Sequence, residues 1–176
     1  MIHDYRINYH NISLRPLERG DIENLRNWRN DPGNTTYLSK IPYITPEMQA
    51  AWFENYIGNR EELCFAIIEN QDLHRMVGSL SLYGFSNHAC LFGKILIGDV
   101  DAHGKKVGVN ATKAAVSIAF GTLNYSTVNL FVYAENKAAC KIYREAGFEI
   151  VDEHLTEDGR REYTMSISRG ETTCTT

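Results

Sequence analysis

A glycine-bearing basic turn that runs directly into an amphipathic helix, within residues 103–120, constrains this sequence most. Small or apolar residues recur at helical spacing from about Val109, at Ala111, Ala114, Ala115, Ile118 and Ala119. The turn therefore lies at a helix N-terminus, where unpaired N–H groups and the helix dipole attract anions. Gly104 and Gly108 are expected to take positive φ and to let the backbone approach a ligand closely. Because Lys105 and Lys106 are disfavoured at this end without an anion, the turn predicts a phosphate site.

Two familiar phosphate-binding turns fit this stretch poorly. No Gly-Lys-Ser/Thr follows at the spacing of a nucleotide P-loop, and no Gly-x-Gly-x-x-Gly opens the helix as in a dinucleotide-binding unit. A glycine-containing loop with two solvated lysines is the alternative that needs no ligand. Evidence from the rest of the chain is needed to choose between a phosphate site and this ligand-free loop.

The hydrophobic pattern of the remaining chain predicts a mixed α/β fold. Apolar runs bounded by turn residues predict strands at 11–17, 63–69, 77–83, 89–98, 128–133, 148–152 and 162–167. Capping residues and helical spacing predict helices at about 21–30, 46–57, 109–120 and 136–146. The first of these helices has an inner face made of Ile22, Leu25 and Trp28 or Arg29. Residues 1–9 are expected to be poorly ordered or to add an edge strand.

Composition limits the class of protein. With 43% hydrophobic and 23% charged residues, the 176-residue chain is an ordinary globular sequence, and we expect one domain over residues 1–176 with an ordered core at about 10–168. A net charge of -4 argues against a broad surface for nucleic acid or membrane. The lack of a signal peptide or long apolar span predicts a cytoplasmic location. Four widely spaced cysteines without a Cys-x-x-Cys pair argue against a metal site.

The stretch from Asn136 to Phe148 identifies a family. Its sequence, Asn-Lys-Ala-Ala-Cys-Lys-Ile-Tyr-Arg-Glu-Ala-Gly-Phe, resembles the N-x-x-A-x-x-x-Y-x-x-x-G-F pattern of the GNAT N-acetyltransferase superfamily at every fixed position. The turn at 103–108 resembles the pyrophosphate loop of that superfamily, Gln/Arg-x-x-Gly-x-Gly/Ala, with departures at His103 and Lys106. The resemblance covers roughly residues 12–167. It is strongest to the branch that contains ribosomal-protein N-terminal and nucleotide-amino-sugar acetyltransferases.

The resemblance implies a fold and a co-substrate. The fold is a GNAT-like mixed, mostly antiparallel twisted sheet of about seven strands, with helices on both faces and a V-shaped cleft between the strands at 89–98 and 128–133. Acetyl-CoA would bind with its pantetheine amides along the first of these strands and its pyrophosphate on the turn. The residues implied to bind it, with no metal, are Leu96, Ile97, Gly98, His103, Gly104, Lys105, Lys106, Val107, Gly108, Val109, Asn136 and Tyr143.

The same resemblance implies that Tyr143 is the catalytic residue. A tyrosine at this position commonly lies near the thioester sulfur, where it can protonate the departing coenzyme A thiolate. Helical periodicity alone favours a core tyrosine whose hydroxyl reaches a carbonyl group. Asn136 likewise has two roles open to it, a contact with the coenzyme and the N-cap of its helix.

The sequence leaves the general base open. Several relatives carry a glutamate five residues before the motif asparagine, where this chain has Phe131. Asp99, His88 and Glu135 are candidates, although each is also an ordinary solvated side chain, and a water chain is another alternative. Backbone N–H groups around Ile97 could polarise the thioester carbonyl, so direct transfer needs no enzyme nucleophile.

These observations predict an enzyme that transfers the acetyl group of acetyl-CoA to a primary amine by direct attack. The expected acceptor is a small molecule such as a nucleotide-linked amino sugar, under the helices at 21–30 and 46–57 and the loop at 33–43. The alternative acceptor is a protein N-terminus, as in ribosomal-protein acetylation. An alternative of another class is a non-catalytic acyl-CoA-binding module. Neither nucleic acid nor membrane is an expected partner, and the sequence allows a homodimer.

Overall fold

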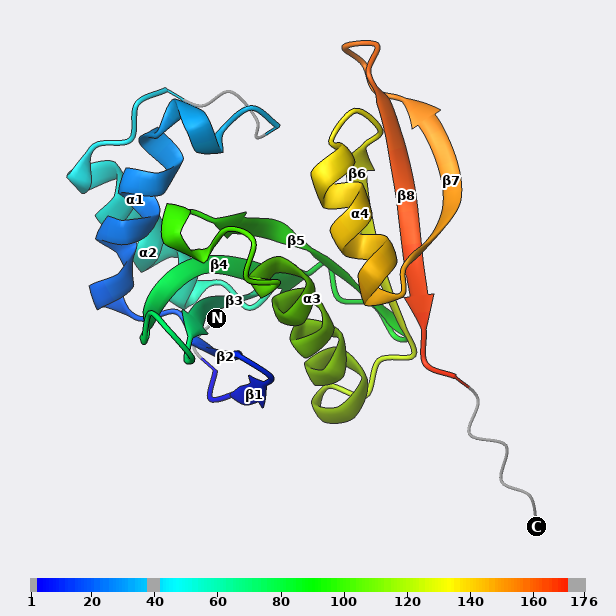
Figure 1. Cartoon of the computed structure of the whole chain (residues 1–176), viewed down its shortest axis with the longest axis horizontal. Coiled ribbons are helices and arrows are strands. Elements are labelled where there is room, and N and C mark those ends of the chain that lie inside the picture. The colour runs from blue at the N-terminus through cyan, green and yellow to red at the C-terminus, as the bar shows by residue number, and fades with distance from the viewer. Residues whose placement is uncertain (1–2, 38–41, 171–176) are drawn as a thin grey trace.

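The computed structural model describes residues 3–37 and 42–170, which form one mixed sheet with helices on both faces (Figure 1). The strands are β1 (Ile7–Tyr9), β2 (Ile12–Pro16), β3 (Glu62–Glu69), β4 (Arg75–Tyr83), β5 (Ala89–Ile97), β6 (Thr127–Tyr133), β7 (Glu149–Leu155) and β8 (Arg161–Ser168). They lie in the order β1-β2-β3-β4-β5-β6-β8-β7. Neighbours are antiparallel except β5 and β6, which are parallel. The predicted mixed, mostly antiparallel sheet is confirmed.

The sheet has eight strands rather than about seven, because residues 7–9 form the edge strand β1. Ile7 pairs with Leu14 and Tyr9 pairs with Ile12, and the side chains of Ile7 and Tyr9 pack on the core. The turn into β2 uses His10, whose φ of 50° is left-handed. Tight hairpins require such a conformation, but Asn-Gly or Asp-Gly is the usual sequence signal for it. The sequence around His10 therefore indicates this hairpin only weakly.

The four α-helices among the described residues are α1 (Ile22–Asn30), α2 (Pro46–Gly58), α3 (Val107–Ser117) and α4 (Lys137–Ala146). Local chemistry explains their ends. The Thr45 hydroxyl accepts a hydrogen bond from the Met48 N–H at 3.2 Å and so caps α2. α4 ends at Gly147, whose φ of 103° is left-handed and favours glycine. A π-helical turn at Ile118–Thr122 extends α3. None of the described helices has the length and hydropathy needed to cross a bilayer.

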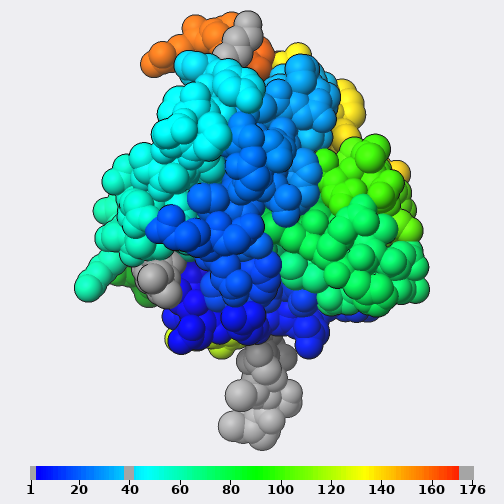
Figure 2. All heavy atoms as spheres, turned by 90° about the vertical axis from the view of Figure 1, so that its left-hand side faces the viewer, coloured from blue at the N-terminus to red at the C-terminus, as the bar shows by residue number. Residues whose placement is uncertain are grey.

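Two apolar cores lie on opposite faces of the sheet. α3 and α4 cover one face, where Phe92, Leu130 and Met165 are almost fully buried. α1 and α2 cover the other face over β2 to β4, and their core is built from Leu17, Leu25, Phe53, Tyr56, Cys64, Ala66 and Met76. Figure 2 views the molecule from the second side and shows α1 and α2, in blue and cyan, lying together over the sheet. The predicted helices on both faces are confirmed.

β5 and β6 pair only at one end. Their ladder has three residue pairs, from Ala89 with Thr127 to Leu91 with Asn129. Beyond this ladder β5 stays paired with β4, whereas β6 stays paired with β8. The two strands therefore diverge, which is the arrangement that the predicted V-shaped cleft requires.

Candidate active site

The predicted phosphate turn lies at the N-terminus of α3. Val107, Gly108 and Val109 form the first helical turn, so the helix begins two residues earlier than the apolar pattern indicates. Within the described residues no side chain caps this end. The N–H groups of the first turn are therefore available to an external acceptor such as a phosphate oxygen.

The two lysines of the turn have different environments. The Lys105 ammonium lies 2.5 Å from a carboxylate oxygen of Asp72, in the β3–β4 turn. The Lys105 carbonyl accepts a hydrogen bond from Asn11 Nδ2 at 3.0 Å, and Asn110 Nδ2 donates to Asn11 Oδ1 at 2.7 Å. Through these contacts, Lys105 holds its turn against the β1–β2 and β3–β4 turns. Lys106 is exposed and is the cation of the turn that remains in solvent.

The two glycines of the turn serve different purposes. Gly104 has a φ of 78°, as predicted. The prediction for Gly108 is wrong, because this residue is helical and buried. A Cβ atom at Gly108 would lie 3.0 Å from Cδ1 of Ile142, so glycine here permits the close packing of α3 on α4. Lys106, which stands where the superfamily pattern has its first glycine, takes the left-handed conformation instead, with φ 58°.

Replacing Lys106 with glycine is expected to stabilise the fold relative to Lys106→Ala. A side chain in the left-handed region costs about 1 kcal/mol, which glycine does not incur. Both variants remove the same charge, so their difference in unfolding free energy isolates the backbone strain. In urea denaturation, the free energy of unfolding of Lys106→Gly should be about 1 kcal/mol higher than that of Lys106→Ala. Equal midpoints would show that the left-handed turn carries no strain.

The end of β5 lies against both α1 and the phosphate turn. A His103 ring nitrogen is 3.3 Å from the Ile97 carbonyl oxygen, and the His103 side chain is exposed. Gly98 follows directly, and a Cβ atom there would lie 2.1 Å from the indole of Trp28. The packing of Trp28 is one reason for a glycine here, and the coenzyme contact that the resemblance implies for Gly98 stays a prediction. Leu96 lines a pocket on the α1 and α2 side.

Tyr143 lies on the buried face of α4. Its ring packs edge-on against Phe92, with centroids 5.9 Å apart, and against Phe148 at 6.2 Å. No residue in the described chain forms a hydrogen bond with its hydroxyl, so the core carbonyl that periodicity favoured is not its partner. Burial raises the pKa of Tyr143, which therefore keeps its proton throughout the neutral range. The phenol can act as a hydrogen-bond or proton donor.

The other predicted polar residues lie apart from one another. Asn136 caps α4, since its Oδ1 accepts a hydrogen bond from the Ala139 N–H at 3.1 Å. Asp99 pairs with Arg75 at 2.7 Å, and this guanidinium lowers the pKa of Asp99. His88 precedes β5 near the paired end of β5 and β6, and Glu135 is exposed in the β6–α4 turn. None of these candidate bases lines the pocket described next.

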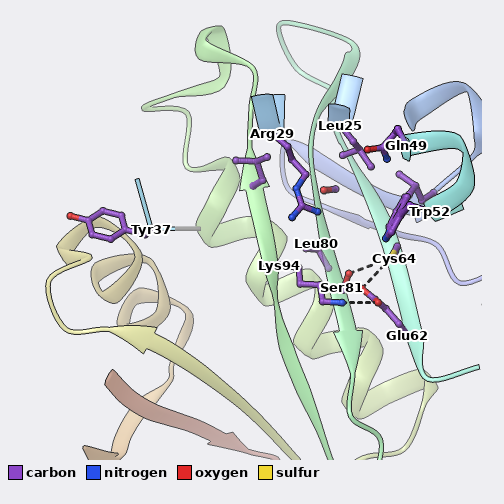
Figure 3. A pocket seen from close by; sticks show the side chains of 13 residues that line it. Leu25, Arg29, Tyr37, Gln49, Trp52, Glu62, Cys64, Leu80, Ser81 and Lys94 are labelled. Carbon is purple, nitrogen blue, oxygen red and sulfur yellow. Dashed lines mark hydrogen bonds and ion pairs between the residues drawn. The ribbon is translucent and has the colours of Figure 1, made fainter. Parts of the chain in front are cut away.

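A pocket of about 400 Å³ lies between α1 and α2 and the strands β3 to β5 (Figure 3). Its walls include Leu25 and Arg29 of α1, and Gln49 and Trp52 of α2. The described lining residues on or near the sheet are Leu17, Glu62, Cys64, Ser79, Leu80, Ser81, Lys94 and Leu96. Tyr37 completes the lining and donates a hydrogen bond to the Glu135 carbonyl at 3.3 Å.

Glu62, Cys64, Ser81 and Lys94 form a polar cluster on the strand side of the pocket. Lys94 Nζ lies 2.7 Å from Glu62, and the Cys64 thiol is 3.3 Å from both Glu62 Oε1 and Ser81 Oγ. Burial would raise the pKa of Glu62, but the hydrogen bonds from Lys94 and Ser81 outweigh it and lower that pKa. Burial, together with the Glu62 charge, raises the pKa of Cys64 to about 12. Cys64 is therefore not a nucleophile at neutral pH.

The sequence prediction missed this cluster, although the two-residue spacing of Glu62 and Cys64 in a strand was a signal for it. Glu62 shares its strand face with Cys64, on the side that packs against α1 and α2. Glu61 and Glu62 precede an apolar run, and two adjacent acids in that position usually indicate a solvated strand end. The pattern of adjacent acids therefore gives no reason to place Glu62 in a pocket. Lys94 faces the pocket because of a β-bulge in β5, where two residues oppose Leu80 and Lys94 has a φ of 52°.

Among the described residues, no group of three or more His, Cys, Asp or Glu side chains is arranged to hold a metal ion.

Comparisons with known proteins identify the family of this chain. A family model described as acetyltransferase (GNAT) domain matches residues 11–149. Spermidine N(1)-acetyltransferase of Escherichia coli K12 is 26% identical over 149 residues, which cover 84% of this chain and 78% of that protein. Acetyltransferase PseH of Campylobacter jejuni serotype O:2 is 25% identical over 137 residues, which cover 78% of this chain and 82% of that protein.

Solved structures show the same fold. Spermidine N-acetyltransferase from Vibrio cholerae, in complex with CoA and spermine, superposes with a TM-score of 0.79 at 24% identity, over 90% of this chain and 96% of that one. An acetyltransferase of the GNAT family from Bacillus anthracis superposes with a TM-score of 0.79 at 15% identity, over 93% and 98%. Because the family match spans most of the sequence, this chain belongs to the GNAT acetyltransferase family, enzymes that take their acyl group from acetyl-CoA.

Proposed function

We propose that this enzyme transfers the acetyl group of acetyl-CoA to the primary amine of a small molecule, of which a nucleotide-linked amino sugar is our first candidate. The pocket between α1, α2 and the strands carries this proposal. Its volume of about 400 Å³ lies in the range of small-molecule sites. Relatives of similar sequence include an enzyme named for a small amine, spermidine N(1)-acetyltransferase, which is 26% identical over 149 residues.

We propose that the donor binds where β5 and β6 diverge. The first turn of α3, with Gly104 and Lys106, would receive the pyrophosphate. The backbone of residues 96–98 would lie along the pantetheine, and Asn136, whose Oδ1 already caps α4, would offer its Nδ2 to the coenzyme. His103, whose ring nitrogen lies beside the Ile97 carbonyl oxygen, would help to hold the end of β5 against the turn that receives the pyrophosphate.

The reaction would proceed by direct attack. The neutral amine nitrogen attacks the acetyl carbonyl carbon, and a backbone N–H near Ile97 stabilises the negative charge that develops on the carbonyl oxygen. The new C–N bond forms, and the C–S bond then breaks with its electron pair on sulfur. Tyr143 donates its hydroxyl proton to that sulfur and regains a proton from solvent as the product nitrogen loses one. No enzyme nucleophile takes part, in agreement with the protonated state of Cys64.

The rate is expected to follow the ionisation of the acceptor. The pKa of Glu62 is lowered and that of Tyr143 is raised, so neither residue changes charge between about pH 5 and 10. The logarithm of kcat/KM should therefore rise with unit slope up to the pKa of the acceptor amine and then level off. Profiles for two acceptors whose amine pKa values differ by about 2 test this. One shared inflection for both acceptors would instead reveal an enzyme base.

A panel of acceptors tests the proposed function. Purified enzyme with acetyl-CoA would be given amino sugars, their phosphorylated forms, polyamines and peptides with free N-termini, and the acetylated products would be identified by mass spectrometry. Acetylation of an amino sugar supports the proposal. Modification of peptide N-termini alone would favour the protein acetyltransferase alternative. Coenzyme binding without transfer to any amine would favour a non-catalytic acyl-CoA-binding module.

A further inference from the structure

Arg29 is the charged side chain of the pocket that has no counter-charge. It lies in the last turn of α1 and enters the pocket from the helix side, whereas Glu62 and Lys94 lie together on the strand side (Figure 3). These are the three charged residues among the described lining. Glu62 and Lys94 neutralise each other at 2.7 Å. The Arg29 guanidinium therefore leaves the pocket with a net positive charge.

The Arg29 guanidinium is also partly buried without a partner. Its Nε is shielded from solvent and forms no hydrogen bond, and no carboxylate in the described chain pairs with Arg29. Residues 38–41, which lie outside the described residues, have the sequence Leu-Ser-Lys-Ile and so contain no acid that could pair with it. A guanidinium cannot lose its proton, and burying its N–H donors without acceptors is costly.

Other arginines of the chain show what Arg29 lacks. Arg15 forms two hydrogen bonds with Asp21, at 2.6 and 2.7 Å. Arg75 pairs with Asp99. The Arg29 side chain instead lines a cavity (Figure 3), and a planar guanidinium binds carboxylate or phosphate through two parallel hydrogen bonds. The pocket thus offers an anion site of the kind that Arg15 and Arg75 fill with side chains of the protein.

We propose that Arg29 binds an anionic group, a phosphate or a carboxylate, carried by the amine acceptor. This inference rests on the proposed function and narrows it to amines that also bear a negative charge. The side-chain amide of Gln49, which is 5% exposed and makes no hydrogen bond within the described chain, supplies a neutral polar contact in the same pocket. A polyamine carries only positive charge and would meet electrostatic repulsion from Arg29.

A set of matched acceptors tests whether the enzyme prefers an amine that carries a phosphate or a carboxylate over a neutral amino sugar or a polyamine. Initial rates would be measured with glucosamine, glucosamine 6-phosphate, glucosaminic acid and spermidine. We expect kcat/KM to be at least about 30-fold higher for the phosphate or the carboxylate than for glucosamine, the range that a close charge pair at an interface produces. The phosphate and carboxylate arms identify which anion the site prefers. Equal values for glucosamine and both anionic forms, or a preference for spermidine, would overturn the inference while the proposed function stands.

Variants assign the effect to Arg29. Arg29→Met, which keeps an unbranched side chain as far as the position of Nε but removes the rest of the guanidinium, should remove the preference for the anionic acceptor over glucosamine. Arg29→Lys should retain part of the preference, because it keeps the charge but loses the bidentate geometry. Arg60→Met is the matched control, since Arg60 is exposed and lies outside the pocket lining. A preference that survives in Arg29→Met would overturn the inference.

A binding measurement makes the test independent of turnover. Trp52 lines the pocket, so its fluorescence reports occupancy. N-acetylglucosamine 6-phosphate and N-acetylglucosamine would be titrated into the wild type and Arg29→Met. Tighter binding of the phosphate that disappears in the variant supports the anion site, even if no amine is acetylated and the proposed function fails. Equal binding of both compounds, or no binding of the phosphate up to millimolar concentration, would overturn it.

Discussion

Replacing Tyr143 with phenylalanine is expected to lower kcat by about 100-fold or more, the range of effects seen when a proton donor is removed. Affinity for acetyl-CoA should change by less than about twofold. The ring packs against Phe92 and Phe148, and phenylalanine preserves that packing. Only the hydroxyl is lost, and no described residue depends on it for a hydrogen bond. Steady-state kinetics together with a calorimetric titration of acetyl-CoA would measure the two effects separately.

Tyr9→Phe is the matched control for this variant, because Tyr9 lies on β1 at the opposite edge of the sheet. It should leave kcat unchanged. If Tyr143→Phe also retains full activity, the leaving thiolate takes its proton from another source, and the role that the family motif implies for Tyr143 does not hold here. Loss of coenzyme binding together with kcat would instead mean that the hydroxyl positions the coenzyme.

Gly98→Ala is expected to destabilise the protein by about 2–4 kcal/mol. A Cβ atom at this position would lie 2.1 Å from the indole of Trp28, far inside the van der Waals separation. The clash involves a rigid ring on α1 and the end of β5, so one of these elements has to move, and overpacking of this kind costs several kcal/mol. Urea denaturation would measure the loss. Gly121→Ala is the control, because nothing lies within 4 Å of a Cβ atom built there.

The reason for this loss can be isolated by a double-mutant cycle. Trp28→Ala removes the ring that Gly98 accommodates and should itself destabilise the α1 packing. In that background Gly98→Ala should cost less than about 1 kcal/mol, so the two substitutions should be strongly non-additive. Additive effects would show that the glycine is needed for a reason other than Trp28. The wild-type contact holds the helix that also carries Arg29.

Local sequence was sufficient where the structure depends on neighbours in the chain. Helix caps act on backbone groups within four residues, and the predicted helices α2 and α4 formed at their caps. These caps are Thr45 for α2, and Asn136 and Gly147 for α4. The phosphate turn was located for the same reason, since a helix start is a local feature. Gly108 was misjudged because its small size serves Ile142, which comes 34 positions later and is brought near only by the packing of α4.

The pocket lies under the helices at 21–30 and 46–57, where the resemblance placed the acceptor, but its charged lining could not be predicted in this way. Its charges come from α1, β3 and β5, and their meeting depends on sheet register and on the bulge that turns Lys94. The sequence placed Trp28 or Arg29 on the inner face of α1 without choosing between them. The fold uses both, because Trp28 packs on Gly98 while Arg29 enters the pocket. Lys105 could not be separated from Lys106 either, since its partner Asp72 belongs to a distant hairpin turn.

The short ladder between β5 and β6 has a thermodynamic consequence. Among the described residues, the strand ladder that joins the five-strand part of the sheet, β1 to β5, to the part formed by β6 to β8 has three residue pairs. A donor molecule held by both strands would bridge these parts and bind only when they are correctly assembled. By mass action, such a ligand raises the melting temperature in proportion to the logarithm of its concentration once the site is saturated. The acyl donor would thus act as a structural component of the enzyme as well as its reagent.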